Sequence, residues 1–282
     1  MSTKKHFNIP GLFEKFHIIK QVVLMYENYP YIFNDNTIIS SFYGSNGGIA
    51  NGGRNSGEYY NEEEVSTFCR EHNICPTIIM SNLFFDKPDK FANKIIEFFG
   101  NKTTMFCVAT PNIEKWLEEK SIRRGQFVLS TTVCLDSEEL IKKTNRYKKI
   151  VLPESMINNW KLLSKLPEQT RNKLEVIVNT ACPIDCKNRK THYEWMSKVN
   201  LRKSVGTFEC IHKYYCGNGA LYEILDGKQV VTTDMIESYL NLGINHFKIQ
   251  GRTNDDNDFI ETLAYYLIKP KYQLLFREKC RE

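Results

Sequence analysis

The sequence predicts a single α/β domain folded as a (β/α)8 barrel, with a distorted or incomplete ring allowed for. Short apolar runs alternate with helical patterns over most of the chain, and its 282 residues suit a barrel, which commonly needs about 250 residues. The runs are continuously apolar, as expected of parallel strands covered on both faces. No Pro/Ser-rich linker divides the chain, so we expect one domain over 1–282 with a Cys-rich insertion around 181–220. A doubly wound open sheet is the second choice.

The predicted elements follow one another from residue 36 onward. The strands are expected at 36–44, 75–82, 104–110, 126–132, 148–154, 174–180 and 246–252. The helices are expected at 60–73, 86–100, 111–121, 136–147, 156–166, 233–243 and 257–269.

Helix-end signals support several of these assignments. The first turn of the helix at 60–73 is rich in Glu, which suits the positive end of a helix dipole. Gly100 stands where a helix should end, and Pro111 stands in a first helical turn. Asp136, followed three residues later by Glu139, forms a capping-box pattern.

Composition narrows the class of protein. The net charge of +5 is mild, and no Lys/Arg block is dense enough to predict an RNA-binding stripe, so a nucleic-acid partner is disfavoured. No run of about 18 apolar residues could span a membrane, and the first residues lack the features of a signal peptide. We therefore expect a cytoplasmic protein whose nine cysteines are not a disulfide framework.

The first candidate site is the Gly-rich loop "YGSNGGIANGGRNSG" at 43–57. It matches neither the dinucleotide nor the P-loop spacing, so a nucleotide site is disfavoured. The alternatives are a flexible surface loop and a ligand-binding loop in which Arg54 pairs with a carboxylate or phosphate.

Four cysteines lie within 35 residues and suggest a shared metal. Cys182 and Cys186 form a C-x3-C pair directly after a strand, and Cys210 and Cys216 follow in "FECIHKYYC". Zinc is one interpretation, with His192 or His212 as substitute ligands, and an iron–sulfur cluster is another. Unrelated thiols and a nucleophilic Cys–His pair also stay open.

The third feature is the stretch "SYLNLGINHFKIQGRTNDD" at 238–256. Alternation along the predicted strand places Lys248, Gln250 and Arg252 on one face. Two cations and an amide in a packed barrel need partners or a polar site. Either a structural layer of ion pairs or a site for an anionic group would satisfy them.

This stretch resembles a known family. "LNLGINHFKIQGR" is similar to the "aGv…lKIEGR" signature of the collagenase-like unassigned peptidase family 32, and "VNTACPIDCKNR" is similar to its cysteine-bearing segment. The resemblance covers residues 174–252. It implies a (β/α)8-like barrel and, in the better-understood members, a four-cysteine [4Fe–4S] cluster. Those members support oxygen-independent hydroxylation of tRNA or rRNA bases or of a ubiquinone precursor.

The sequence departs from this pattern in three respects, the first of which is that its cysteine pattern differs from that of the hydroxylases. Gln250 stands where the family usually has a glutamate, and no additional RNA-binding domain is evident. The resemblance therefore favours an iron–sulfur enzyme, an oxidoreductase or hydroxylase, acting on a small anionic metabolite. Cys182, Cys186, Cys210 and, as the weaker fourth, Cys216 would hold the cluster. Zinc is the alternative metal.

In this hypothesis Arg54, Gln250, Lys248 and Arg252 bind the substrate, and His192, Asn179 and Lys248 take part in catalysis. Two alternatives from other classes remain. One is a non-catalytic, metal-stabilised subunit of a heteromeric enzyme, because some members of the family work in pairs. The other is a peptidase-type hydrolase. Homo- or hetero-oligomers fit any of the three.

Overall fold

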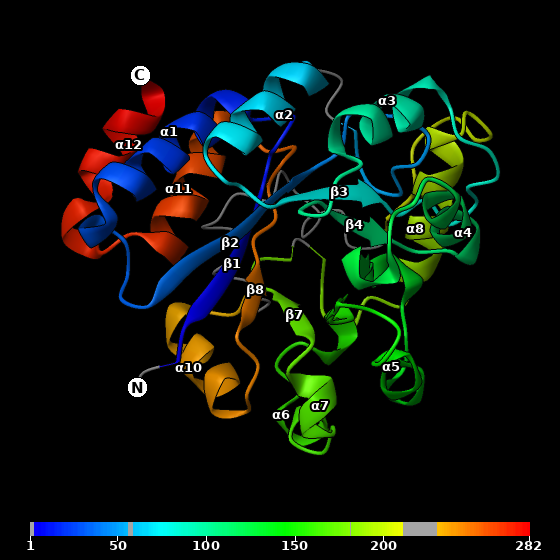
Figure 1. Cartoon of the computed structure of the whole chain (residues 1–282). Coiled ribbons are helices and arrows are strands. Elements are labelled where there is room, and N and C mark those ends of the chain that lie inside the picture. Colours follow the sequence, from blue (N-terminus) through cyan, green and yellow to red (C-terminus); the bar gives the residue numbers. More distant parts are fainter. Residues whose placement is uncertain (1–2, 56–58, 181, 211–229) are drawn as a thin grey trace.

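The chain folds into a closed barrel of eight parallel strands surrounded by helices (Figure 1). The computed structural model describes residues 3–55, 59–180, 182–210 and 230–282. Each strand pairs with the next, and the last pairs with the first, which confirms the predicted barrel and excludes an open sheet. The strands are β1 Lys5–Pro10, β2 Thr37–Gly44, β3 Pro76–Met80, β4 Met105–Val108, β5 Phe127–Leu129, β6 Lys149–Val151, β7 Leu174–Ile177 and β8 His246–Lys248.

Helices follow most of the strands and form the outer layer. They are α1 Phe16–Asn28, α2 Glu62–Glu71, α3 Lys90–Phe99, α4 Pro111–Glu119, α5 Ser137–Lys143, α6 Trp160–Leu163, α7 Glu168–Arg171, α8 Arg189–Asn200, α10 Thr233–Asn241, α11 Asp256–Leu267 and α12 Gln273–Arg281. The capping box of Asp136 and Glu139 forms as predicted at the start of α5. Within the described ranges, no helix has the length and apolar content needed to cross a bilayer.

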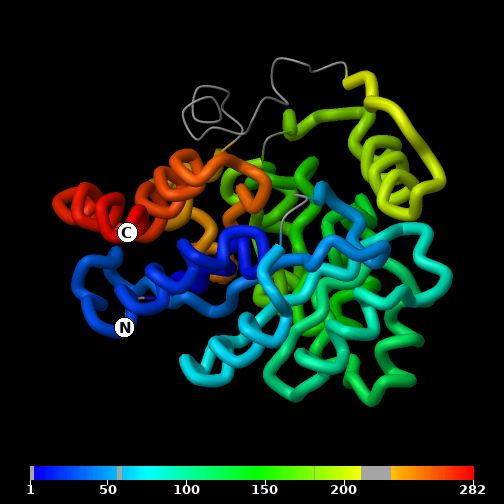
Figure 2. The backbone as a smooth tube through the Cα atoms, turned by 90° about the horizontal axis from the view of Figure 1, so that it is seen from above, coloured from blue at the N-terminus to red at the C-terminus, as the bar shows by residue number. Residues whose placement is uncertain are grey.

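The first and last helices lie side by side on one side of the barrel. The C-terminal helix α12 packs against α1 and α11, and both views place it beside the first helix (Figures 1 and 2). Neither β1, α1 nor α12 was among the predicted elements. β1 supplies the seam that closes the ring, since it pairs with both β2 and β8.

The last strand is shorter than its sequence pattern predicts. β8 ends at Lys248, and the backbone turns at Gly251, where φ is +134°. Gln250 and Arg252 therefore follow the strand rather than belong to it, although both line the same cavity as Lys248.

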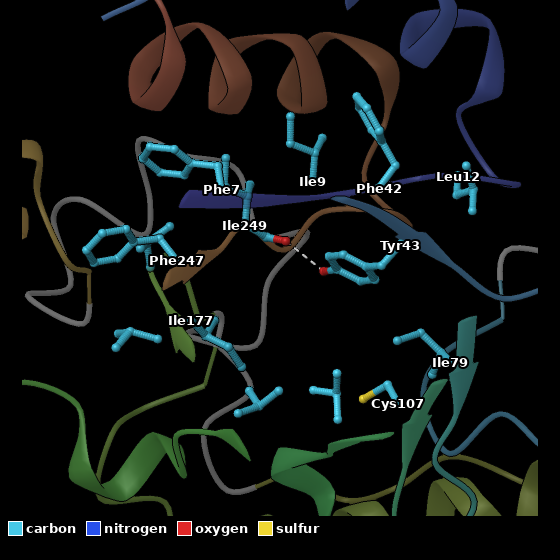
Figure 3. Packing of buried hydrophobic residues seen from close by; sticks show 14 of the residues in the cluster. Phe7, Ile9, Leu12, Phe42, Tyr43, Ile79, Cys107, Ile177, Phe247 and Ile249 are labelled. Carbon is cyan, nitrogen blue, oxygen red and sulfur yellow. Dashed lines mark hydrogen bonds between the residues drawn. The ribbon is translucent and has the colours of Figure 1, made fainter. Parts of the chain in front are cut away.

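The layer between the strands and the helices is apolar, whereas the space inside the ring of strands is partly polar. Figure 3 shows the packed apolar side chains, among which Phe7, Ile9 and Phe42 are buried. Inside the ring, Ser41 Oγ donates to Asn8 Oδ1 at 2.6 Å, and Asn8 Nδ2 donates to Glu175 at 3.3 Å. This chain of hydrogen bonds gives the buried Glu175 carboxylate a fixed position beneath the mouth.

Two histidines face each other at the opposite end of the barrel. His6 and His246 are neighbours in the β1–β8 register, with ring centroids 4.9 Å apart. Burial, together with Lys149, His6 and Lys148, lowers the pKa of His246 to about 3. Burial, Lys149 and Lys4 also lower the pKa of His6. The folded protein therefore holds both rings neutral.

This pair predicts a stability loss in acid. Between its ordinary pKa of 6.5 and its folded pKa of about 3, His246 binds a proton only in the unfolded chain. Its contribution is complete above 6.5 and is lost as the pH falls, by about 2 kcal/mol from about pH 7 to about pH 5. Urea unfolding at several pH values should show this slope, and His246→Gln should flatten it. An unchanged slope in His246→Gln would contradict the assignment.

Candidate functional site

A cavity of about 210 Å³ opens at the carboxyl ends of the strands, where barrel enzymes place their active sites. Its inner walls are apolar. Tyr43, Ile79, Cys107 and Ile177 come from four different strands and surround one space inside the ring (Figure 3). We call this space the inner cavity. The inner cavity is also lined by most of the site residues predicted from the sequence: Arg54, Asn179, Cys182, His192, Lys248, Gln250 and Arg252.

The Gly-rich loop is packed onto the barrel rim. A Cβ at Gly52 would lie 2.0 Å from the Ser81 carbonyl oxygen, so the loop approaches the end of β3 at a distance that only glycine permits. At Gly53, a Cβ would lie 2.6 Å from the Arg252 guanidinium. The two glycines therefore give room to the backbone on one side and to a cavity cation on the other.

Further contacts fix this loop in place. Asn200, at the end of α8, donates to the carbonyl oxygens of Asn51 and Gly53, both at 2.8 Å. The backbone N–H of Asn82 donates to the Ala50 carbonyl oxygen at 2.9 Å. Arg54, the next residue, is exposed at the cavity entrance, and no carboxylate lies within ion-pair distance of it in the part of the chain that is described.

One face of helix α8 forms a cavity wall. Arg189, His192, Tyr193 and Met196 all line the inner cavity, and their spacing of three, four and seven residues places them on the same side of a helix. Of these, the sequence pointed only to His192. The others were missed because polar side chains occupy the face that a core-packed helix would fill with apolar ones.

Glu154 organises the base of this wall. It begins the short helical turn Glu154–Met156 after β6 and is only 1% exposed. Its carboxylate accepts hydrogen bonds from Thr131 at 2.6 Å and Tyr193 at 2.5 Å, and it lies 3.8 Å from Arg189 Nε. Burial and the Glu154 carboxylate raise the pKa of Tyr193 well above its usual value. The phenol therefore stays protonated and donates to the carboxylate.

Two cations project into the cavity from the β8 end. Lys248 lies 3.9 Å from Glu175 and 4.1 Å from the centroid of the Tyr43 ring. Arg252 lies 3.2 Å from Glu14, whose pKa is raised by burial against the opposing effect of Arg252. Structural ion pairing and a cavity-facing position therefore coexist here, although the sequence suggested them as alternatives.

Asn179 joins β7 to the segment that follows β8. Its Oδ1 accepts a hydrogen bond from the backbone N–H of Gln250 at 2.6 Å, and its Nδ2 donates to the backbone carbonyl oxygen of Gln250 at 2.9 Å. Both halves of the Asn179 amide are therefore engaged with backbone. In this arrangement Asn179 is a positioning residue, because it fixes the segment that carries Gln250 and Arg252.

His192 presents a neutral imidazole to the cavity. Burial and the nearby Arg54 lower its pKa, and its ring stacks on Phe208 with centroids 4.6 Å apart. A neutral ring can accept a proton or a hydrogen bond from a ligand. No hydrogen bond between His192 and Cys182 occurs in the structure as described, so the two do not form a nucleophile–base pair here.

The predicted metal ligands are only partly in view. Cys182 lines the inner cavity, and its pKa is raised by burial and by Glu154. Cys186 and Cys210 are partly buried but do not line the cavity, and Cys216 lies outside the described residues. Across residues 3–55, 59–180, 182–210 and 230–282, no three His, Cys, Asp or Glu side chains are grouped to hold a metal. Because Cys216 lies outside these ranges, the four-cysteine set of an iron–sulfur cluster stays a prediction.

A wider groove continues outward from the inner cavity. The two share Arg54, Met196, Thr253 and Asn254, and the groove has a volume of about 1110 Å³. Its cations include Lys90 and Arg202, while its acids Asp89 and Asp255 are engaged as the N-caps of α3 and α11. The groove provides a route from solvent to the inner cavity that passes Arg54.

Comparison with solved structures agrees with this description of the fold. No protein-family model and no curated protein matches the sequence. One solved structure, described as that of the U32 peptidase Mk0906, is similar with a TM-score of 0.53 and 12% sequence identity. The match covers 88% of this chain and 93% of that one. At this identity the likeness shows a shared barrel fold, found in a protein of the family that the sequence resembles.

Proposed function

We propose that the inner cavity is the active site of an enzyme acting on a small anionic metabolite. The observation that carries this proposal is the charge of the cavity lining. Arg54, Lys248 and Arg252 all border the space, and Arg54 has no carboxylate partner among the described residues. A carboxylate or phosphate would supply the missing negative charge, and a guanidinium binds such groups through paired hydrogen bonds.

The lining also contains groups that can move a proton. His192 is neutral, whereas Tyr193 keeps its proton because burial and Glu154 raise its pKa. A base therefore stands on this helical face beside the proposed anion site, while the Tyr193 hydroxyl stays hydrogen-bonded to Glu154. In this proposal the cations orient the ligand by its anionic group, and His192 accepts a proton from the ligand or returns one to it.

Calorimetric titration with inorganic phosphate, pyruvate and oxalate tests the binding step. Arg54→Ala should weaken binding of an accepted anion about 5- to 10-fold, corresponding to loss of about 1 kcal/mol from one charge-assisted contact. Lys161→Ala, which removes an exposed lysine of α6 outside both cavities, should leave affinity unchanged. Equal affinity in wild type and Arg54→Ala would overturn the assignment of Arg54.

The peptidase alternative finds less support in the cavity. Hydrolysis by a thiol needs an activated nucleophile with a base in contact. Burial raises the pKa of both cavity thiols, Cys182 and Cys107, and His192 is not hydrogen-bonded to Cys182. The cavity thus favours ligand binding and proton transfer over covalent thiol catalysis.

The iron–sulfur cofactor is a separate proposal that rests on the sequence resemblance. Anaerobic purification should yield a brown protein with about four irons and four sulfides per chain. Cys182→Ala should lose the colour, while Cys75→Ala, next to the start of β3 at the far end of the barrel, should retain it. A colourless protein with stoichiometric zinc would overturn the proposal. Co-purification of a second chain that completes the activity would favour the subunit alternative.

A further inference from the structure

Lys248 is unusually placed for a charged residue. It is the last residue of β8, only 6% exposed, and it borders the inner cavity. An ammonium group carries three N–H donors, and buried ones are normally all accepted by oxygen atoms. The Lys248 nitrogen donates no hydrogen bond to any described residue, and the Glu175 carboxylate oxygen of its ion pair is 3.9 Å away.

The groups around the Lys248 nitrogen are mostly apolar or aromatic. On one side is the Tyr43 ring, held in place because its hydroxyl donates to the Ile249 carbonyl oxygen at 2.6 Å (Figure 3). The apolar side chains of Ile79 and Ile177 line the same space. The open direction for the nitrogen's donors, or for its lone pair, is therefore the cavity.

Glu175 lies between two ammonium groups, 3.9 Å from Lys248 and 3.8 Å from Lys149, and it accepts hydrogen bonds from Asn8. Written as ions, the three groups carry one net positive charge.

From this arrangement we infer that Lys248 is an amine nucleophile that forms an imine with the carbonyl carbon of a small oxo acid. The inference deepens the proposed function and rests on it, because Arg252 and Arg54 would bind the acid group of the same molecule. The unprotonated Lys248 nitrogen attacks the carbonyl carbon, and the carbonyl oxygen takes up a proton to give a carbinolamine. Loss of that oxygen as water forms the C=N bond, with no oxidant or reductant consumed.

Glu175 is the group placed to handle the proton. Its carboxylate lies 3.9 Å from the Lys248 nitrogen, it does not line the cavity, and its position is fixed by Asn8. The carboxylate can accept the proton that the ammonium releases and return it when the hydroxyl leaves as water. Glu175 would thus act through Lys248, as a positioning and proton-holding residue, without touching the substrate.

Reductive trapping tests this inference directly. Wild-type protein is incubated with pyruvate or glyoxylate and sodium cyanoborohydride, and the adduct is located by intact mass and peptide mapping. We expect one adduct per chain, on Lys248, and its complete loss in Lys248→Arg and Lys248→Met. Far-ultraviolet circular dichroism confirms that each variant is folded. Labelling spread evenly over surface lysines such as Lys161, or no labelling, would overturn the inference.

Reductive trapping and the phosphate titration together separate this inference from the proposed function. If phosphate binds and depends on Arg54 while no adduct forms on Lys248, the imine is wrong and the anion site stands. If the Lys248 adduct forms but neither phosphate nor any carboxylate binds in a manner that depends on Arg54, the anion site is wrong and the nucleophile stands. The mapping uses the native lysine, so its outcome does not depend on a variant that folds poorly.

Discussion

Replacing Glu154 with alanine is expected to lower the free energy of unfolding by about 3–5 kcal/mol, because the change leaves the buried Arg189 charge without its carboxylate. Arg189 and Glu154 side chains are 8% and 1% exposed. The Thr131 and Tyr193 hydroxyls would lose their acceptor as well. Denaturant unfolding followed by fluorescence measures the loss. Removal of Glu138, exposed in an i, i+4 pair with Lys142, should cost less than about 0.5 kcal/mol.

A second variant distinguishes charge from packing. Replacing Glu154 by Leu and Arg189 by Met together removes both charges, and we expect it to recover much of the stability lost in Glu154→Ala. The recovery is limited because Arg189 also donates to the Ile184 and Pro183 carbonyl oxygens. If the double variant is no more stable than Glu154→Ala, the unpaired charge is not the cause of the loss.

Replacing Gly52 with alanine should cost about 3 kcal/mol, the upper end for overpacking, and should also weaken anion binding. The new Cβ would meet backbone atoms of Ser81, which cannot rotate away as a flexible side chain would. The loop must therefore move off the end of β3, and Arg54 moves with it. Thermal unfolding and the phosphate titration measure the two effects.

Gly125 provides the matched control. It is exposed, and a Cβ built there meets no atom within 4 Å. Gly125→Ala should therefore leave both the unfolding temperature and the anion affinity unchanged. A Gly52→Ala variant that binds phosphate like the wild type would show that Arg54 does not depend on the loop's close approach to the strand.

The fold could be predicted from the sequence because parallel strands buried on both faces leave continuous apolar runs. The strands from Thr37 onward each fell within a predicted range, and the helix ends marked by Gly100, Pro111 and Asp136 were found. The missed strand β1 is six residues long with polar residues at its start and a register shift between Phe7 and Asn8. Such a strand is defined by the partners on its two sides rather than by its own pattern.

The candidate site could be predicted in part. Residues at strand ends, such as Lys248 and Asn179, were found because strand ends converge at the mouth of a barrel. Tyr193 and Arg189 were not, since they lie on a helix that the apolar periodicity did not reveal. The role of Asn179 as a backbone clamp depends on Gln250, 71 residues away, and no local pattern encodes that contact.

Because helix α8 forms one wall of the cavity, residues that contact a ligand are separate from the residues that hold the barrel together. The cavity face of this helix consists of a few side chains, whereas the ring of strands is closed by backbone hydrogen bonds in which this helix takes no part. Changes at His192 or Met196 can therefore reshape the space offered to a ligand without disturbing strand pairing. Arg189 is the exception, because its charge is tied to Glu154. Ligand preference in this protein should thus be alterable by substitution at two positions, with the barrel serving as an unchanged frame.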